Sequence, residues 1–182
     1  MMDLVITISG LHGTGKSTYA KAIASSLNFR YISAGSFFRQ IAEERGLTLL
    51  ELSEKAELDD SIDDLIDKRT RIEAEKGSVI LDGLLAGWIA REYADLKIFL
   101  KASNKVRICR IAKREEISYK LAEKKTLERE SIERNRFMKK YGFDILDLSI
   151  YDYVLNTGLL SIDSNIEIVN KLIEEYISNK IC

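Results

Sequence analysis

The sequence is poor in several residue types that carry structural or chemical information. Its 182 residues include no proline, two cysteines and one histidine. Cys109 falls in a helical pattern and Cys182 is the last residue, so the pair forms neither a disulfide framework nor a metal-ligand spacing, and a reducing cytoplasm fits best. No apolar run approaches the ~18 residues of a membrane span, and no basic and apolar leader opens the sequence. We therefore expect a soluble, cytoplasmic protein without a membrane partner.

Net charge is also nearly absent, with 28 Lys and Arg against 29 Asp and Glu. Nothing global indicates a nucleic-acid partner, and a small-molecule partner is favoured. Charge is uneven locally, because residues 105–140 hold 13 basic and 6 acidic residues and residues 43–75 hold 12 acidic and 5 basic ones. Solvated helix faces explain the acidic segment. The basic segment permits the same explanation and a second one, in which its arginines contact a bound phosphate.

The clearest motif is SGLHGTGKSTYA, residues 9–20. Gly10, four residues, then Gly15, Lys16 and Ser17 form the P-loop pattern, placed between an apolar run and an amphipathic stretch as the motif requires. Loop N–H groups and the following helix N-terminus would hold the phosphates, with Lys16 on the β- and γ-phosphates and the Ser17 hydroxyl on Mg²⁺. We interpret His12 as an incidental exposed histidine, at a position where the backbone does the binding. The residues expected to bind the nucleotide are Gly10, Leu11, His12, Gly13, Thr14, Gly15, Lys16, Ser17 and Thr18.

Apolar runs alternate with helical patterns along the whole chain, which predicts one α/β domain with a five-stranded parallel sheet flanked by helices. Strands are expected at residues 3–9, 29–32, 78–83, 96–100 and 151–157, and helices at 15–27, 37–46, after the capping box at 48–51, up to Gly77, and at 103–116, 124–141 and 163–178. The helix before Gly77 is expected to bury Ile62, Leu65, Ile66 and Ile72.

Two further polar residues fall at the expected ligand-binding edge of this sheet. Asp82 ends a buried strand, where it could hold Mg²⁺ through water or contact substrate; the alternative is a plain Asp-Gly turn. Arg39 lies on the first turns of the helix after the second strand and could fork onto a phosphate, the alternative being a surface arginine.

Taken together, GLHGTGKST, SAGSFFR, LDGLLAGW, ADLKIFLKA, ERESIERNR and YDYVLNT resemble nucleoside monophosphate kinases, most closely the archaeal-type cytidylate kinases. The resemblance covers nearly the whole chain. It implies a P-loop kinase with a core at 1–35, 77–114 and 142–182, an acceptor-binding helical arm at about 36–76, and a short lid and following helix at about 115–141, the lid itself at about 115–125.

The same resemblance implies roles for particular residues. The acceptor nucleotide would be held by Ser33, Gly35, Arg39, Asp82 and Gly83, with Glu133 contacting the cytidine. Arg129 and Arg136 would approach the transferring phosphates, and Arg110 and Arg114 would close over ATP. The alternative for residues 129–136, which share one helix face, is a solvated Glu–Arg ladder. Position 84 is Leu where the family has an arginine, so one phosphate-binding arginine is missing.

The resulting hypothesis is transfer of the γ-phosphoryl group of ATP, with Mg²⁺, to CMP or dCMP by a monomer or small homo-oligomer. The acceptor phosphate is already ionised near pH 7, so no catalytic histidine is expected. The alternatives are a kinase of AMP, UMP, shikimate or dephospho-coenzyme A, and a P-loop switch protein. An RNA-binding role for the basic segment is poorly supported, because no aromatic platform accompanies it.

Overall fold

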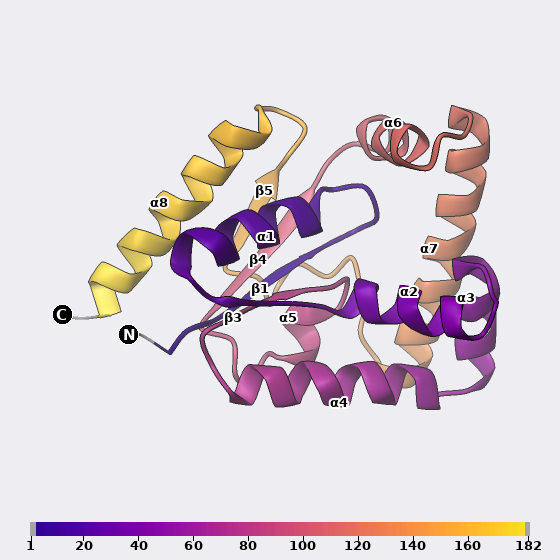
Figure 1. Ribbon diagram of the computed structural model, residues 1–182, viewed down its shortest axis with the longest axis horizontal. Helices are drawn as coiled ribbons and strands as arrows, with labels where there is room; N and C mark the ends of the chain where they lie inside the picture. The colour runs from indigo at the N-terminus through magenta and orange to yellow at the C-terminus, as the bar shows by residue number, and fades with distance from the viewer. Residues whose placement is uncertain (1–2, 181–182) are drawn as a thin grey trace.

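The computed structural model describes residues 3–180, and Cys182 lies outside them. Five parallel strands form one sheet in the order β2-β3-β1-β4-β5, which confirms the predicted fold class (Figure 1). The strands are β1 (Val5–Gly10), β2 (Arg30–Ser33), β3 (Val79–Asp82), β4 (Leu96–Lys101) and β5 (Tyr153–Asn156).

The central position of β1 follows from its composition. All six of its residues are buried, as expected for a strand covered on both faces. In the register of the sheet, Ile8 lies opposite Asp82, and Asp82 lies opposite Ser33. The P-loop, which follows Gly10, and the carboxyl ends of β2 and β3 therefore meet at one edge of the sheet.

Helices cover both faces of the sheet. On one face, α1 (Lys16–Leu27) and α8 (Ile162–Lys180) pack Ile23, Val169 and Ile173 against Ile6 and Ile8. On the other, the start of α5 (Ala86–Ile89) and the end of α4 (Ser61–Glu75) pack against alternate residues of β1 and β3. This alternation of side chains across β1 is what a two-sided core requires.

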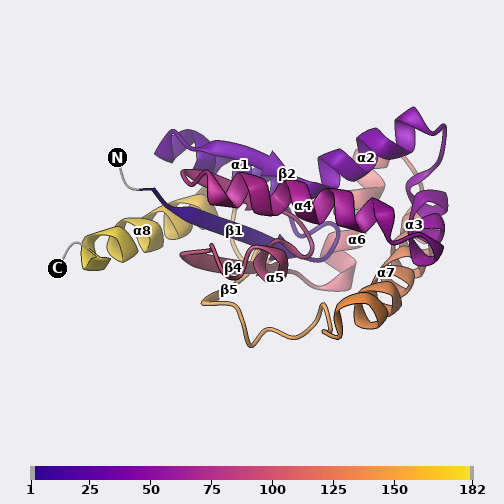
Figure 2. The ribbon, with the colours of Figure 1, turned by 90° about the horizontal axis from the view of Figure 1, so that it is seen from below.

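The remaining helices lie beyond the carboxyl ends of the strands. They are α2 (Ala34–Glu44), α3 (Leu49–Leu58), α6 (Asn104–Glu115) and α7 (Tyr119–Tyr141). Figure 2 shows them gathered at the end toward which the arrow of β1 points. The capping box predicted at residues 48–51 is present, because the Thr48 hydroxyl accepts from the Glu51 N–H and the Glu51 carboxylate from the Thr48 N–H. Helices α2, α3 and α4 share an apolar cluster of their own, and we call these three helices the arm; its role in binding the acceptor stays a prediction.

Two local predictions are wrong. The helix predicted over residues 124–141 begins earlier, at Tyr119, because Ser118 caps α7 through the Leu121 N–H and Ala122 packs against α6. Residues 116–118 connect α6 to α7. On α4, Ile62 is buried but Leu65 and Ile72 are exposed. This helix turns polar side chains inward instead, toward a cavity described below.

Among the described residues, no helix is long and apolar enough to cross a bilayer.

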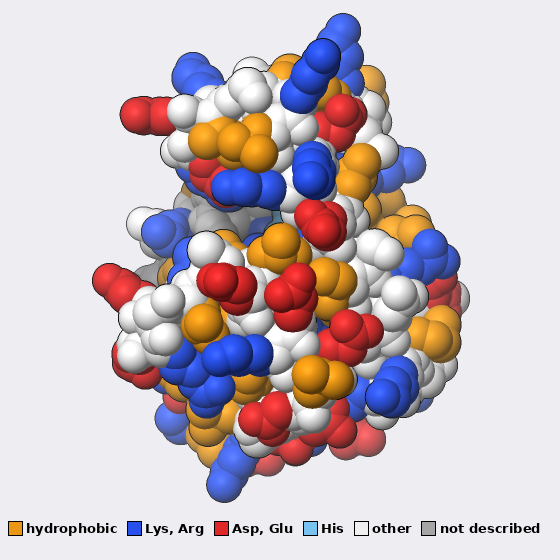
Figure 3. All heavy atoms as spheres, turned by 90° about the vertical axis from the view of Figure 1, so that its right-hand side faces the viewer, with side chains coloured by type: hydrophobic (Ala, Val, Ile, Leu, Met, Phe, Trp, Pro, Cys, Tyr) orange, Lys and Arg blue, Asp and Glu red, His pale blue; other side chains and the backbone are white. Residues whose placement is uncertain are grey.

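On the side of the molecule that is at the right of Figure 1, Lys and Arg side chains alternate with Asp and Glu side chains (Figure 3).

Candidate active site

The P-loop wraps tightly where β1 ends. Gly13 and Gly15 have positive φ angles of 78° and 93°, a region that residues with a Cβ rarely adopt. A Cβ on Gly13 would also lie 2.5 Å from the Arg107 carbonyl oxygen. The loop closes through the Thr14 hydroxyl, which donates to the Leu11 carbonyl at 2.8 Å. The glycine spacing of the motif is therefore required by the backbone itself.

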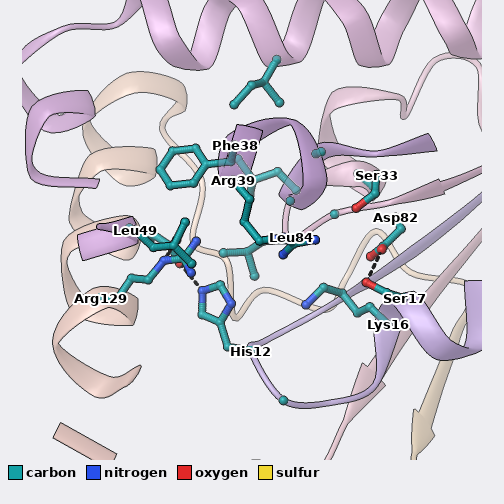
Figure 4. Close-up of a pocket in the computed structure, with 18 of the residues that line it drawn as sticks. His12, Lys16, Ser17, Ser33, Phe38, Arg39, Leu49, Asp82, Leu84 and Arg129 are labelled. Carbon is teal, nitrogen blue, oxygen red and sulfur yellow. Dashed lines mark hydrogen bonds and ion pairs between the residues drawn. The ribbon is translucent and has the colours of Figure 1, made fainter. Parts of the chain in front are cut away.

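A cavity of about 800 Å³ opens beside this loop, bounded by the sheet edge, the arm, α6 and α7. It brings together most residues singled out from the sequence: His12, Gly13, Gly15, Lys16, Ser17, Thr18, Ser33, Gly35, Arg39, Asp82, Gly83, Arg110, Arg114, Arg129, Glu133 and Arg136. Gly10, Leu11 and Thr14 do not line it and belong to the frame of the loop. Figure 4 shows Lys16, Ser17 and Asp82 on one side of the cavity and His12, Leu49 and Arg129 on the other.

Lys16, Ser17 and Asp82 form the polar group at the sheet edge. The Lys16 ammonium donates to the Leu11 carbonyl at 3.1 Å, and burial lowers its pKa. The Ser17 hydroxyl donates to Asp82 Oδ2 at 2.6 Å, and Tyr31 donates to the same oxygen at 2.8 Å. The Ser17–Asp82 oxygen pair is a donor set that suits Mg²⁺, which is often held by one or two protein oxygens plus substrate phosphates. Within residues 3–180 no cluster of three or more His, Cys, Asp or Glu could hold a metal alone.

His12 is not an incidental exposed residue. Its side chain is 21% exposed, and its Nε2 lies 2.7 Å from Glu133 Oε2. Its backbone N–H donates to Glu130 Oε1 at 3.2 Å, so α7 holds both the ring and the main chain of this P-loop residue. The prediction failed because Glu130 and Glu133 are more than a hundred residues away in the sequence.

Glu133 carries a buried negative charge at this junction. Burial raises its pKa, but His12 and Arg129 outweigh that effect and bring it down to about 2. Burial lowers the pKa of His12, so a neutral ring donates from Nε2 to a carboxylate that only accepts. Arg129 Nε donates to the other carboxylate oxygen at 2.8 Å. Both oxygens of Glu133 are therefore engaged, and its contact with cytidine stays a prediction.

Arg107 was not predicted from the sequence, although it is among the largest fully buried side chains. Its guanidinium pairs with Glu130 at 2.5 Å and donates to the His12 carbonyl at 2.8 Å and to Asn104 at 2.6 Å. The sequence did contain a signal for Arg107, because positions 107, 110 and 114 lie on one face of a helix and arginines 110 and 114 were already expected at the site.

The other predicted arginines differ in their contacts. Arg110 donates to the hydroxyl and carbonyl of Thr157 at 3.0 and 2.8 Å. Arg114 is exposed and pairs with its neighbour Glu115. Within the described part of the chain, Arg39 donates to the Ser36 hydroxyl alone, at 3.0 Å. Arg39 and Arg114 therefore have most of their donors available for a ligand.

Arg136 faces the arm. Its Nε lies 3.0 Å from Asp63 Oδ2, and its NH1 donates to the Ser53 carbonyl at 3.1 Å. The approach of Arg136 to the transferring phosphates stays a prediction. Nearby, Lys140 pairs with Asp64, so the acidic and basic segments of the sequence meet here instead of both facing solvent.

Comparison with known proteins agrees with this architecture. A sequence model described as the cytidylate kinase-like family matches residues 5–159. The chain belongs to this family. Its relatives include the cytidylate kinase of Staphylothermus marinus, 48% identical and covering 96% of this chain and 98% of the relative. The cytidylate kinase of Ignicoccus hospitalis is 45% identical, and the match covers 93% of this chain and 98% of that relative.

Among solved structures, the shikimate kinase of Bacteroides thetaiotaomicron aligns with a TM-score of 0.63 at 18% identity, covering 95% of this chain and 99% of that one. The shikimate kinase of Acinetobacter baumannii, in complex with shikimate, aligns with a TM-score of 0.60 at 15% identity, and the match covers 100% of this chain and 97% of that one. At such identities the likeness shows the fold alone.

Proposed function

We propose that the protein is an enzyme that transfers the γ-phosphoryl group of ATP to CMP or dCMP, forming ADP and CDP or dCDP. The observation that carries the proposal is that a single cavity is lined by both the P-loop and the helical arm. The donor's phosphates and the acceptor's phosphate could therefore meet without leaving the site. The names of the relatives support cytidylate as the acceptor.

The chemistry asked of the protein is positioning and charge neutralisation. In phosphoryl transfer the phosphate oxygens carry the developing charge, and the acceptor's phosphate is already ionised near neutral pH. Lys16 would neutralise the β- and γ-phosphates, while Arg110 and Arg114 from α6 and Arg129 from α7 approach from the opposite side. Ser17 and Asp82 would hold Mg²⁺, which when bound neutralises phosphate charge and orients the phosphates.

The acceptor would bind along the arm. The Ser33 hydroxyl caps α2 through the Ser36 N–H, which fixes the start of the helix that carries Gly35 and Arg39. Arg39 has free donors for a phosphate monoester. Leu84 also lines the cavity and supplies no charge, so Arg39 would bear most of the acceptor's phosphate charge on this side. We also propose a cytoplasmic location and a monomer or small homo-oligomer.

The test is ADP release from ATP and Mg²⁺ with CMP, dCMP, UMP, AMP or shikimate as acceptor. We expect the highest kcat/KM with CMP or dCMP and none above background when Lys16 is replaced by Ala. Preference for AMP or shikimate would overturn the acceptor assignment, and nucleotide binding without turnover of any acceptor would favour a switch protein.

A further inference from the structure

The arm end of the cavity carries two carboxylates that the phosphoryl transfer does not use. Asp63 and Asp67 lie one turn apart on α4 and line the cavity, with exposed fractions of 5% and 8%. Carboxylates repel phosphate, so they do not serve the phosphate end of either nucleotide. Burying such groups in a cavity wall is costly unless a partner compensates them.

The two carboxylates differ in how they are satisfied. Asp67 Oδ2 accepts a hydrogen bond from the Tyr141 hydroxyl at 2.6 Å. Asp63 Oδ2 and Arg136 Nε form a buried ion pair at 3.0 Å, whereas Asp63 Oδ1 accepts no hydrogen bond from the described residues. The ion pair holds Asp63 in place, and its second oxygen, Oδ1, is left available to a ligand in the cavity.

A carboxylate oxygen without a partner, beside a guanidinium that lines the same cavity, is an arrangement that can bind the edge of a nucleobase. Cytosine presents an exocyclic amine that donates, beside N3 and O2, which accept, and carboxylates pair with that amine. Uracil presents a carbonyl at the position of the amine and an N3–H, so it would place an acceptor against the carboxylate. The available oxygen of Asp63 therefore matches cytosine and opposes uracil.

The surroundings suit a flat base. Phe38 and Leu49 line the same part of the cavity, and Phe38 is 6% exposed (Figure 4). The Arg136 guanidinium lies 5.9 Å from the Phe38 ring centre, so the ring and the polar pair adjoin. Glu133, the residue expected from the resemblance to contact cytidine, has both oxygens bonded within the protein. Asp63 has the free capacity that Glu133 lacks.

We propose that Asp63 determines acceptor specificity by accepting a hydrogen bond from the 4-amino group of cytosine, while Arg136 donates to the neighbouring ring acceptors. This inference rests on the proposed function and deepens it. It places Arg136 on the base instead of the transferring phosphates. The proposed contact does not involve the sugar, so it does not distinguish CMP from dCMP.

The test compares kcat/KM for CMP and UMP, at saturating ATP and pH 8, in the wild type, Asp63→Asn and Asp67→Asn. An asparagine amide can both accept from cytosine and donate to uracil. We expect Asp63→Asn to lower the CMP-to-UMP ratio roughly 10- to 100-fold, the size of one hydrogen bond to a charged group, with the KM for ATP unchanged. Asp67→Asn, the matched control, should shift both acceptors by the same factor.

A wild type that phosphorylates no CMP would refute the proposed function itself. A wild type that prefers CMP, combined with an unchanged ratio in folded Asp63→Asn, would refute only the base contact. Because Asp63→Asn removes a buried charge next to Arg136 and could unfold the arm, a second measurement uses the wild type alone. The kcat/KM for the 2-pyrimidinone analogue of CMP, which lacks the 4-amino group, should be lower than that for CMP by a similar factor. Equal kcat/KM values for CMP and the analogue would overturn the proposal.

Discussion

Replacing Arg107 by Ala is expected to destabilise the protein strongly, although this side chain does not line the cavity. The guanidinium is buried and makes hydrogen bonds to Glu130, His12 and Asn104. Its removal leaves the Glu130 carboxylate, 11% exposed, and the His12 carbonyl without their main partner. Removing one partner of a buried ion pair lowers the free energy of unfolding by about 3–5 kcal/mol, which is a large part of the ~5–15 kcal/mol of a typical protein.

The assay is urea denaturation followed by far-UV circular dichroism, from which the free energy of unfolding is extrapolated. The matched control is Lys113→Ala, an exposed residue of the same helix, for which we expect a change within about 0.5 kcal/mol. Arg107→Lys should fall between the two, because it keeps the charge and loses the two-pronged contact. A loss below about 1 kcal/mol for Arg107→Ala would refute the view that this pair supports the P-loop.

Three other outcomes follow from the site. Lys16→Ala should abolish phosphoryl transfer while the far-UV spectrum and the melting temperature stay near those of the wild type, since little packing is lost. Arg39→Ala should raise the acceptor's KM by an amount corresponding to about 1.5–3 kcal/mol and leave ATP affinity nearly unchanged. Steady-state kinetics with each substrate varied in turn would measure both, and a loss of ATP affinity with an unchanged acceptor KM would contradict the assignment. Burial, partly opposed by Arg136, raises the pKa of Asp63 from its ordinary 3.8 to about 6. The folded protein therefore binds more protons between these values. The free energy of unfolding of the wild type, relative to that of Asp63→Asn, should fall by about 2–2.5 kcal/mol as pH rises from 4 to 7, which denaturation at several pH values would measure.

The sheet and the P-loop could be predicted because their signals are local. The buried run before the glycines, the strand that ends at Asp82 and the Thr48 capping box each depend on residues a few positions apart, and all three are confirmed. The boundary of α7 was missed because Ser118, an ordinary N-cap residue, lies in a polar stretch that also suits a loop.

The contacts that join distant segments could not be predicted. His12 has no neighbour in sequence that would mark it as buried, and its partners come from α7. Asp63 and Asp67 were included in a solvated acidic face, but α4 turns them inward because opposing groups on α7 compensate their charge. A helical pattern gives the face on which a residue lies, and only the fold decides what that face meets.

The contacts between the arm and α7 also join two parts of the molecule mechanically. Asp63, Asp64 and Asp67 of α4 are bonded to three residues of α7, and Ser53 of α3 adds a fourth contact. Through Glu130 and Glu133, α7 is also bonded to His12 of the P-loop, so this one helix connects the acceptor side of the cavity to the donor side. Thermodynamic reciprocity applies to any coupling through this connection: whatever factor ATP imposes on the Kd of the acceptor, the acceptor imposes on the Kd of ATP.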